Sequence, residues 1–244
     1  MEVHHHPELP HGKKKHFKEY VLEFLMIFLA VTMGFIAENI REHISDHSKE
    51  KEYITGMIKD LAIDTTNLKT IINYNKKQKR GIDSLRTIPK EKLTDIKVQD
   101  SLYLYTHKYL FEFHPFKNDD ATLIQLRNAG GYRLIRNQNV LDSIAGYESR
   151  INISGIQLNY LYASLTKSID AASAVFDLNE YSKFKSNPLT TPVLITTDKE
   201  KINAFYNQSW LMSIAVKNYG EMLEDQLEYT SHLIKNIKAQ YDIE

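Results

Sequence analysis

Three arginines near the middle of the chain are the residues whose types and spacing most directly indicate chemistry. Arg127, Arg133 and Arg136 flank or follow the turn "NAGGY". Guanidinium groups at a helical corner can bind a phosphate or carboxylate through paired hydrogen bonds. They can equally form structural ion pairs with nearby carboxylates such as Asp119 and Asp120. The arginines are therefore candidate contacts for an anionic ligand, with structural pairing as the alternative.

The remaining chemical candidates are weak. His43 and His47 lie four residues apart, a spacing that can hold a metal on one helical face, but two ligands do not make a site. The paired glycines at 130–131 lack the Lys-Ser/Thr step of a P-loop. Five further histidines lie in the first sixteen residues, in a tail predicted to bind metal only incidentally: His4, His5, His6, His11 and His16.

No catalytic motif accompanies these residues. The chain has no cysteine, no nucleophile elbow, no set of four metal ligands and no paired-carboxylate motif. We therefore predict no catalytic residue, no metal site, no cofactor and no enzyme activity. The enzymatic alternative is a hydrolase whose site is assembled from residues scattered along the chain.

One acidic residue stands inside the most apolar run of the chain. Between Tyr20 and Ala37 the only charged residue is Glu23. These residues would reach about 27 Å as a helix, against about 30 Å for a bilayer core, whereas the apolar part of a signal peptide is usually about 7–15 residues long. The run predicts a transmembrane helix over residues 18–37, in preference to a cleaved signal or a buried core helix.

The position of Glu23 on that helix suggests a contact face. At about 100° per residue, Ala30, Gly34 and Ala37 fall within about 40° of Glu23. Small residues allow two helices to approach closely, and an acidic group beside them can hydrogen-bond across the contact. The alternative is that Glu23 lies at the interface, where it reaches water or Lys18.

Charge distribution predicts the topology and limits the partners. Lys13, Lys14, Lys15 and Lys18 precede the apolar run, and Arg41 follows it, so the N-terminus is expected in the cytoplasm and the remainder outside the inner membrane. Lys plus Arg and Asp plus Glu number 31 each, which gives no basic excess for nucleic acid. The predicted partners are the membrane and either a second copy of the chain or an envelope protein.

The elements that must carry these residues are long helices. With 9 Gly and 6 Pro, the chain has few breakers, and apolar residues recur at steps of three and four. We predict an all-α fold, a transmembrane helix followed by an antiparallel bundle of long helices. Its parts are a His/Lys-rich tail (1–17), the span (18–37), a membrane-proximal helix (38–87) and the rest of the bundle (88–244).

Several boundaries within the bundle can also be predicted. The aromatic segment 99–116 favours a helix, although its "LYLY" alternation also permits a strand. Asn118 or Asp119 is expected to cap a short helix that Gly130 ends in a left-handed conformation. A capping box beginning at Thr197 is expected to start the last long helix.

Four stretches together resemble a known group of proteins. These are "HHHPE", the lysine cluster with "FKEYVLEFLMIFLAVTMGFIAENIRE", "KEKEYI" and "QLRNAGGYRLIRN". They are similar to uncharacterised single-pass inner-membrane proteins of Bacteroidota, most densely over residues 4–54 and 119–147. The resemblance implies an inner-membrane location in a Gram-negative envelope and brings no activity or site residue with it. We expect a membrane-anchored protein-interaction domain, with a ligand-sensing bundle as the alternative.

Overall fold

The computed structural model describes residues 17–180 and 194–243. It is 85% helical, and its described part contains no strand, only an isolated bridge between Phe176 and Leu194. The prediction of an all-α fold is confirmed. The five α-helices are α1 (Phe17–Arg86), α2 (Ile96–Tyr105), α3 (Ala121–Asn128), α4 (Gln138–Ser173) and α6 (Lys199–Tyr241). The histidine and lysine tail and the loop "KSNPLTTP" lie outside the described residues.

The chain divides into two compact units, Met1–Lys51 and Glu52–Glu244. The described part of the first unit is the N-terminal part of α1. It contains an 18-residue window with a mean hydropathy of 2.1, and none of that window is buried. By length and composition this helix can cross a membrane.

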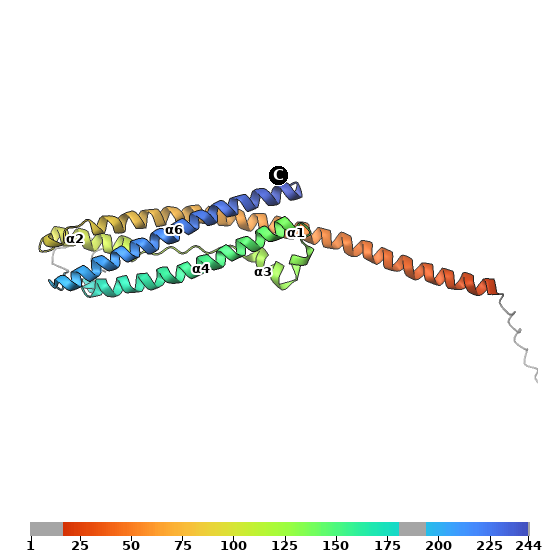
Figure 1. The fold of residues 1–244 in the computed structure, drawn as a ribbon, viewed down its shortest axis with the longest axis horizontal. Coiled ribbons are helices and arrows are strands. Elements are labelled where there is room, and N and C mark those ends of the chain that lie inside the picture. The colour runs from red at the N-terminus through yellow and green to blue at the C-terminus, as the bar shows by residue number, and fades with distance from the viewer. Residues whose placement is uncertain (1–16, 181–193, 244) are drawn as a thin grey trace, which may run out of the picture. The chain divides into compact units, whose positions relative to one another are not determined.

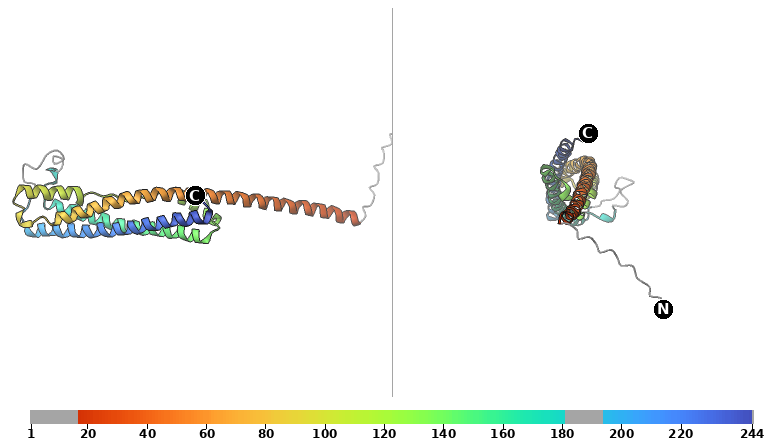
Figure 2. Two further views of the ribbon diagram at one scale, coloured as in Figure 1. Left: turned by 90° about the horizontal axis from the view of Figure 1, so that it is seen from above. Right: turned by 90° about the vertical axis from the view of Figure 1, so that its right-hand side faces the viewer.

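The second unit is a bundle in which three long helices lie side by side (Figures 1 and 2). Asn75 Nδ2 on α1 donates to the carbonyl of Val216 at 3.0 Å, and Tyr206 Oη donates to the carbonyl of Ile88 at 3.0 Å, so α6 runs antiparallel to α1. Between α4 and α6, Gln208 donates to the carbonyl of Ser164 at 3.3 Å. Figures 1 and 2 show these two helices antiparallel as well, so α1 and α4 run in the same direction.

An extended return segment explains how α1 and α4 can be parallel. Pro89 follows the end of α1, and the chain folds back through α2 and the π-helix η2 (Thr106–Leu110). Residues 111–120 then have no regular secondary structure. Their backbone is held by side chains of the long helices, since Phe116 N donates to Tyr219 Oη at 2.9 Å. The aromatic segment that permitted a strand is therefore helical up to Leu110.

The core of the second unit is split into two hydrophobic clusters. The larger one includes Leu68, Leu102, Phe176, Phe205 and Leu223. The smaller one includes Ile54, Leu126, Ile144, Leu233 and Ile237. Each cluster draws on α1, α4 or its flanks, and α6, so the packing repeats along the bundle.

A layer of buried polar residues separates the two clusters. Along each long helix, residues between the two clusters are polar and buried: Asp64 on α1, Ser154 on α4, and Gln226 and Thr230 on α6. Thr230 Oγ1 donates to the carbonyl of Gln226 at 2.7 Å, whereas Ser154 Oγ and Gln226 Oε1 have no hydrogen-bond partner in the described part of the chain. Such a layer favours one register of the helices, because sliding a helix would place its polar residue against an apolar cluster.

Two predicted helix caps differ from the structure. Neither Asn118 nor Asp119 caps α3; its N-cap residue is Asp120, whose side chain makes no capping hydrogen bond. Helix α6 is capped by Asp198, one residue after the predicted Thr197, and Asp198 Oδ1 accepts from Glu200 N at 2.8 Å. Gly130 has the predicted left-handed conformation, with φ of 63°.

Candidate interaction surfaces

The predicted contact face of the span lies in a part of α1, residues 17–44, where every residue except Thr32 is exposed. Glu23, Ala30, Gly34 and Ala37 are all exposed. A side chain added at Gly34 would meet nothing within 4 Å, so the glycine is not required by packing within the chain. The face is open to another helix, and its role in helix contact stays a prediction.

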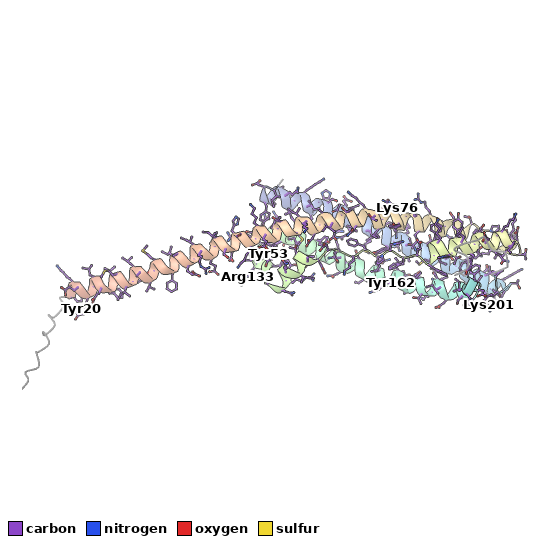
Figure 3. The ribbon with its side chains drawn as sticks, turned by 180° about the vertical axis from the view of Figure 1, so that it is seen from behind. Tyr20, Tyr53, Lys76, Arg133, Tyr162 and Lys201 are labelled. Carbon is purple, nitrogen blue, oxygen red and sulfur yellow. The ribbon has the colours of Figure 1, made fainter. Side chains whose placement is uncertain are left out.

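The arginine corner forms at the turn between α3 and α4, where Figure 3 labels Arg133. Arg127 binds Glu148 on α4 through two contacts, Nη2 to Oε1 at 2.8 Å and Nε to Oε1 at 3.0 Å. Tyr132 Oη donates to the same oxygen at 2.6 Å. Burial, together with the hydrogen bond to the Glu148 carboxylate, raises the pKa of Tyr132 to about 12.

These contacts hold the turn between α3 and α4 against α4. Arg127 takes the structural alternative, although its partner is Glu148 and not Asp119 or Asp120. Arg133 and Arg136 are exposed, and their binding of an anionic ligand stays a prediction. Arg127 and Glu148 are 21 residues apart, so no local sequence pattern indicates this pair.

Two aspartates of α1, which were not identified from the sequence, hydrogen-bond to the backbone at the start of α3. Asp60 Oδ2 accepts from Thr122 N at 2.8 Å, and Asp64 Oδ1 accepts from Asp119 N at 2.7 Å. Asp60 supplies an acceptor that the first turn of α3 lacks locally, Asp64 binds the residue before the N-cap, and the helix N-terminus favours negative charge. Glycine at position 56 permits this close approach, because a Cβ there would lie 2.7 Å from Thr122 Oγ1.

Asp64 is fully buried and is shared between two donors. Its second oxygen accepts a short hydrogen bond from Tyr147 Oη on α4. Burial raises the pKa of Asp64, although the hydrogen bonds from Tyr147 and Asp119 oppose that shift. Burial and the Asp64 carboxylate also raise the pKa of Tyr147. The spacing of Asp60 and Asp64, four apart within the apolar stripe, is the sequence signal for buried carboxylates.

An apolar surface of a different kind lies on the outer side of α4. Ile153, Ile156 and Tyr160 are 52%, 71% and 61% exposed. At about 100° per residue they fall within about 60° of one another, and the buried Ser154 and Leu161 lie about 80–160° away from them around the helix. We call Ile153, Ile156 and Tyr160 the outer α4 face.

The outer α4 face is also free of charge. Residues 151–166 include no Asp, Glu, Lys or Arg, in a chain that is 25% charged. A shallow recess shared by Tyr160, Lys167 and Leu211 links the face to α6, where Leu211 is 45% exposed. Exposed apolar groups are ordinary when scattered, but a contiguous uncharged row on one helix is typical of an interaction surface.

The described residues contain no group of three or more His, Asp or Glu side chains placed to hold a metal ion. Comparisons of the chain with protein-family models, curated proteins and solved structures found no match. The function of the chain is therefore inferred from these surfaces.

Proposed function

We propose that the chain is a single-pass inner-membrane protein whose helical domain lies in the periplasm and associates with a second copy of itself, without catalysing a reaction. The observation that carries this proposal is the outer α4 face. An exposed, uncharged apolar row lowers the solubility of a protein unless another surface covers it. A second molecule can cover the outer α4 face without any rearrangement of the core.

A second copy fits this face better than an unlike partner. Copies anchored in one membrane share their orientation, so equivalent surfaces meet in a parallel arrangement around a twofold axis, and each residue lies near its own equivalent. Charged residues in such a position would repel. The absence of charge from residues 151–166 removes that repulsion.

The small size of the outer α4 face is consistent with membrane anchoring. One helix face alone covers less area than a stable soluble dimer requires. Confinement to a membrane raises the effective concentration of one copy near another, and a second contact through Glu23, Ala30, Gly34 and Ala37 would add to it.

The location rests on the charge distribution around the span, with four lysines before it and Arg41 after it. A reporter enzyme fused after Glu244 tests it directly. We expect activity from a reporter that works only in the periplasm, and activity from a cytoplasm-specific reporter would contradict the proposed topology.

Self-association is tested by single cysteines in an otherwise cysteine-free chain. Ile156→Cys in native membranes should form a disulfide-linked dimer on mild oxidation. Lys69→Cys, on the exposed side of α1, is the matched control and should remain monomeric. Tyr160→Glu in the Ile156→Cys background should reduce dimer yield at least about fivefold by placing like charges together.

Two outcomes of the crosslinking experiment would refute the proposal. Equal dimer yields at positions 156 and 69 would mean that collisions, and not the outer α4 face, bring copies together. A crosslink from position 156 to a different protein, with no self-crosslink, would replace the second copy by an envelope partner. The alternative function, ligand sensing, depends on a separate groove.

A further inference from the structure

A groove of about 460 Å³ lies on the second unit between α1 and the α2–η2 segment. Its α1 side carries Lys77, Arg80 and Gly81, and the opposite side carries Lys108 and Tyr109. The volume lies within the range of about 300–1,000 Å³ that is usual for small-molecule sites. The groove is remote in sequence from the outer α4 face and does not depend on it.

The wall of the groove is held in place by a buried side chain. Gln78, only 5% exposed, donates from Nε2 to the carbonyls of Tyr109 at 3.1 Å and Glu112 at 2.5 Å. Gly81 lets the Tyr109 ring lie against the α1 backbone, because a Cβ there would come within 2.0 Å of that ring. The spacing of the two walls is therefore fixed by the fold.

The backbone of that wall has an uncommon conformation. Thr106–Leu110 forms a π-helix, and it contains both Lys108 and Tyr109. Single π-helical turns are rare and occur frequently at functional sites. Here the turn directs one cation and one aromatic ring to the groove.

Three cations line this groove without a carboxylate partner. Lys77, Arg80 and Lys108 are exposed, and none of them forms an ion pair within the described residues. The groove also contains the carboxylate of Glu112, which lies 3.6 Å from His114 Nε2. Three positive charges against one negative charge leave the groove basic.

Neighbouring cations of α1 that do not line the groove have carboxylate partners. Lys76 Nζ lies 2.6 Å from Glu224, Lys79 Nζ lies 2.6 Å from Asp83, and Arg86 lies 3.7 Å from Asp83. Within one stretch of α1, the cations outside the groove therefore have acidic partners, and those inside it do not.

Aromatic rings accompany the cations in the groove. Tyr74, Tyr105 and Tyr109 line it. Lys77 Nζ lies over the Tyr74 ring, 6.0 Å from its centre, and Lys108 Nζ lies over the Tyr109 ring, 5.4 Å from its centre. The Tyr74 ring also stacks on His114, with ring centres 4.4 Å apart, so the groove already holds one stacked pair of planar rings. Tyrosine faces stack on planar rings, and cations beside them bind acidic groups. From this arrangement we infer that the groove binds a small soluble organic anion, a planar ring that carries a phosphate or carboxylate group.

Phenyl phosphate is the probe that combines both chemical groups. Its binding to the full chain in a neutral detergent can be measured by ligand-observed NMR, with inorganic phosphate and phenol as separate fragments. We expect phenyl phosphate to bind at least about tenfold more tightly than either fragment, since its two groups share one site. Monomeric dihexanoylphosphatidic acid, a phosphate without a ring, should bind no better than inorganic phosphate.

Separate substitutions test the cationic and the aromatic residues of the groove. Arg80→Gln should weaken phenyl phosphate at least about fivefold, while Lys69→Gln, an exposed lysine of the same helix outside the groove, should change it less than about twofold. Tyr74→Leu should weaken phenyl phosphate and leave inorganic phosphate unchanged. Each variant should keep the helical circular dichroism of the parent chain, because the altered side chains are exposed.

Three results would overturn this inference. One is an absence of phenyl phosphate binding at millimolar concentration. Another is equal weakening by Arg80→Gln and Lys69→Gln, which would indicate general charge attraction. The third is tighter binding of the phosphatidic acid than of phenyl phosphate, which would indicate a lipid headgroup. Failure of self-association at the outer α4 face would leave all three measurements unaffected.

Discussion

Replacement of Tyr147 by Phe removes one hydroxyl from the centre of the bundle and leaves the packing volume nearly unchanged. Tyr147 is 1% exposed and Asp64 is 0% exposed, so water does not replace the lost donor. Hydrogen bonds to charged groups contribute about 1.5–3 kcal/mol, and a buried acceptor left without a donor costs a similar amount. We expect Tyr147→Phe to lower the free energy of unfolding by about 1.5–3 kcal/mol.

The loss should depend on pH in a defined direction. Burial raises the folded-state pKa of Asp64 above its ordinary value, so ionisation of Asp64 lowers stability as the pH rises through that folded pKa. Without the Tyr147 hydroxyl the folded pKa rises further, and the variant loses more stability on ionisation. The difference between wild type and Tyr147→Phe should therefore be small near about pH 4 and grow toward neutral pH.

Urea unfolding of residues 38–244, followed by far-ultraviolet circular dichroism, measures this difference. Tyr160→Phe is the matched control, because Tyr160 lies on the same helix, is 61% exposed and should change stability by less than about 0.5 kcal/mol. In an Asp64→Asn background, Tyr147→Phe should cost less than it does alone. Equal effects of Tyr147→Phe and Tyr160→Phe at neutral pH would refute the assignment of this hydrogen bond as a stabilising contact.

Three further predictions concern the bundle and the span. Residues 38–244 made without the span should be soluble and mainly helical by circular dichroism, and a spectrum dominated by strand would contradict the fold. Gly81→Ala should lower stability by about 1–3 kcal/mol in thermal unfolding because its Cβ would overlap the Tyr109 ring, whereas Gly155→Ala, with nothing within 4 Å, should be neutral or stabilising. Gly34→Leu should abolish crosslinking of cysteines placed at Ala30 in native membranes, and Ile36→Leu should not; crosslinks that survive Gly34→Leu would make the span a passive tether.

Periodic patterns predicted the long helices well because each one buries an apolar stripe along its own length. The apolar residues at steps of three and four from Ile54 to Leu85 and from Ile144 to Leu161 lie in or against the core, whereas Ile40 and Ile44, which begin the same predicted pattern after the span, are 56% and 65% exposed. Gly130 was predictable for a local reason, since a left-handed residue after a helix is usually glycine. These features depend on residues that are close in sequence.

The features that position the candidate surfaces depend on residues far apart in sequence. Asp64 joins Asp119 and Tyr147 across 55 and 83 residues, and Gln78 holds Tyr109 across 31. Side chains that hydrogen-bond to an irregular backbone leave no periodicity. The predicted cap of α3 was wrong for this reason, because its acceptors come from another helix.

The sequence also does not show which charged and apolar side chains are used in packing and which remain exposed, because that depends on the same long-range contacts. In sequence, Lys76, Lys77, Lys79 and Arg80 form one basic run with no sign of two populations. The fold places Lys76 and Lys79 against carboxylates and leaves Lys77 and Arg80 in a groove with tyrosines. On α4, likewise, Ile151 contributes to the core while Ile153 and Ile156 do not. Exposed side chains that make no contact needed for folding can be changed at little cost in stability. They are therefore the side chains that can be adapted to bind a partner or ligand.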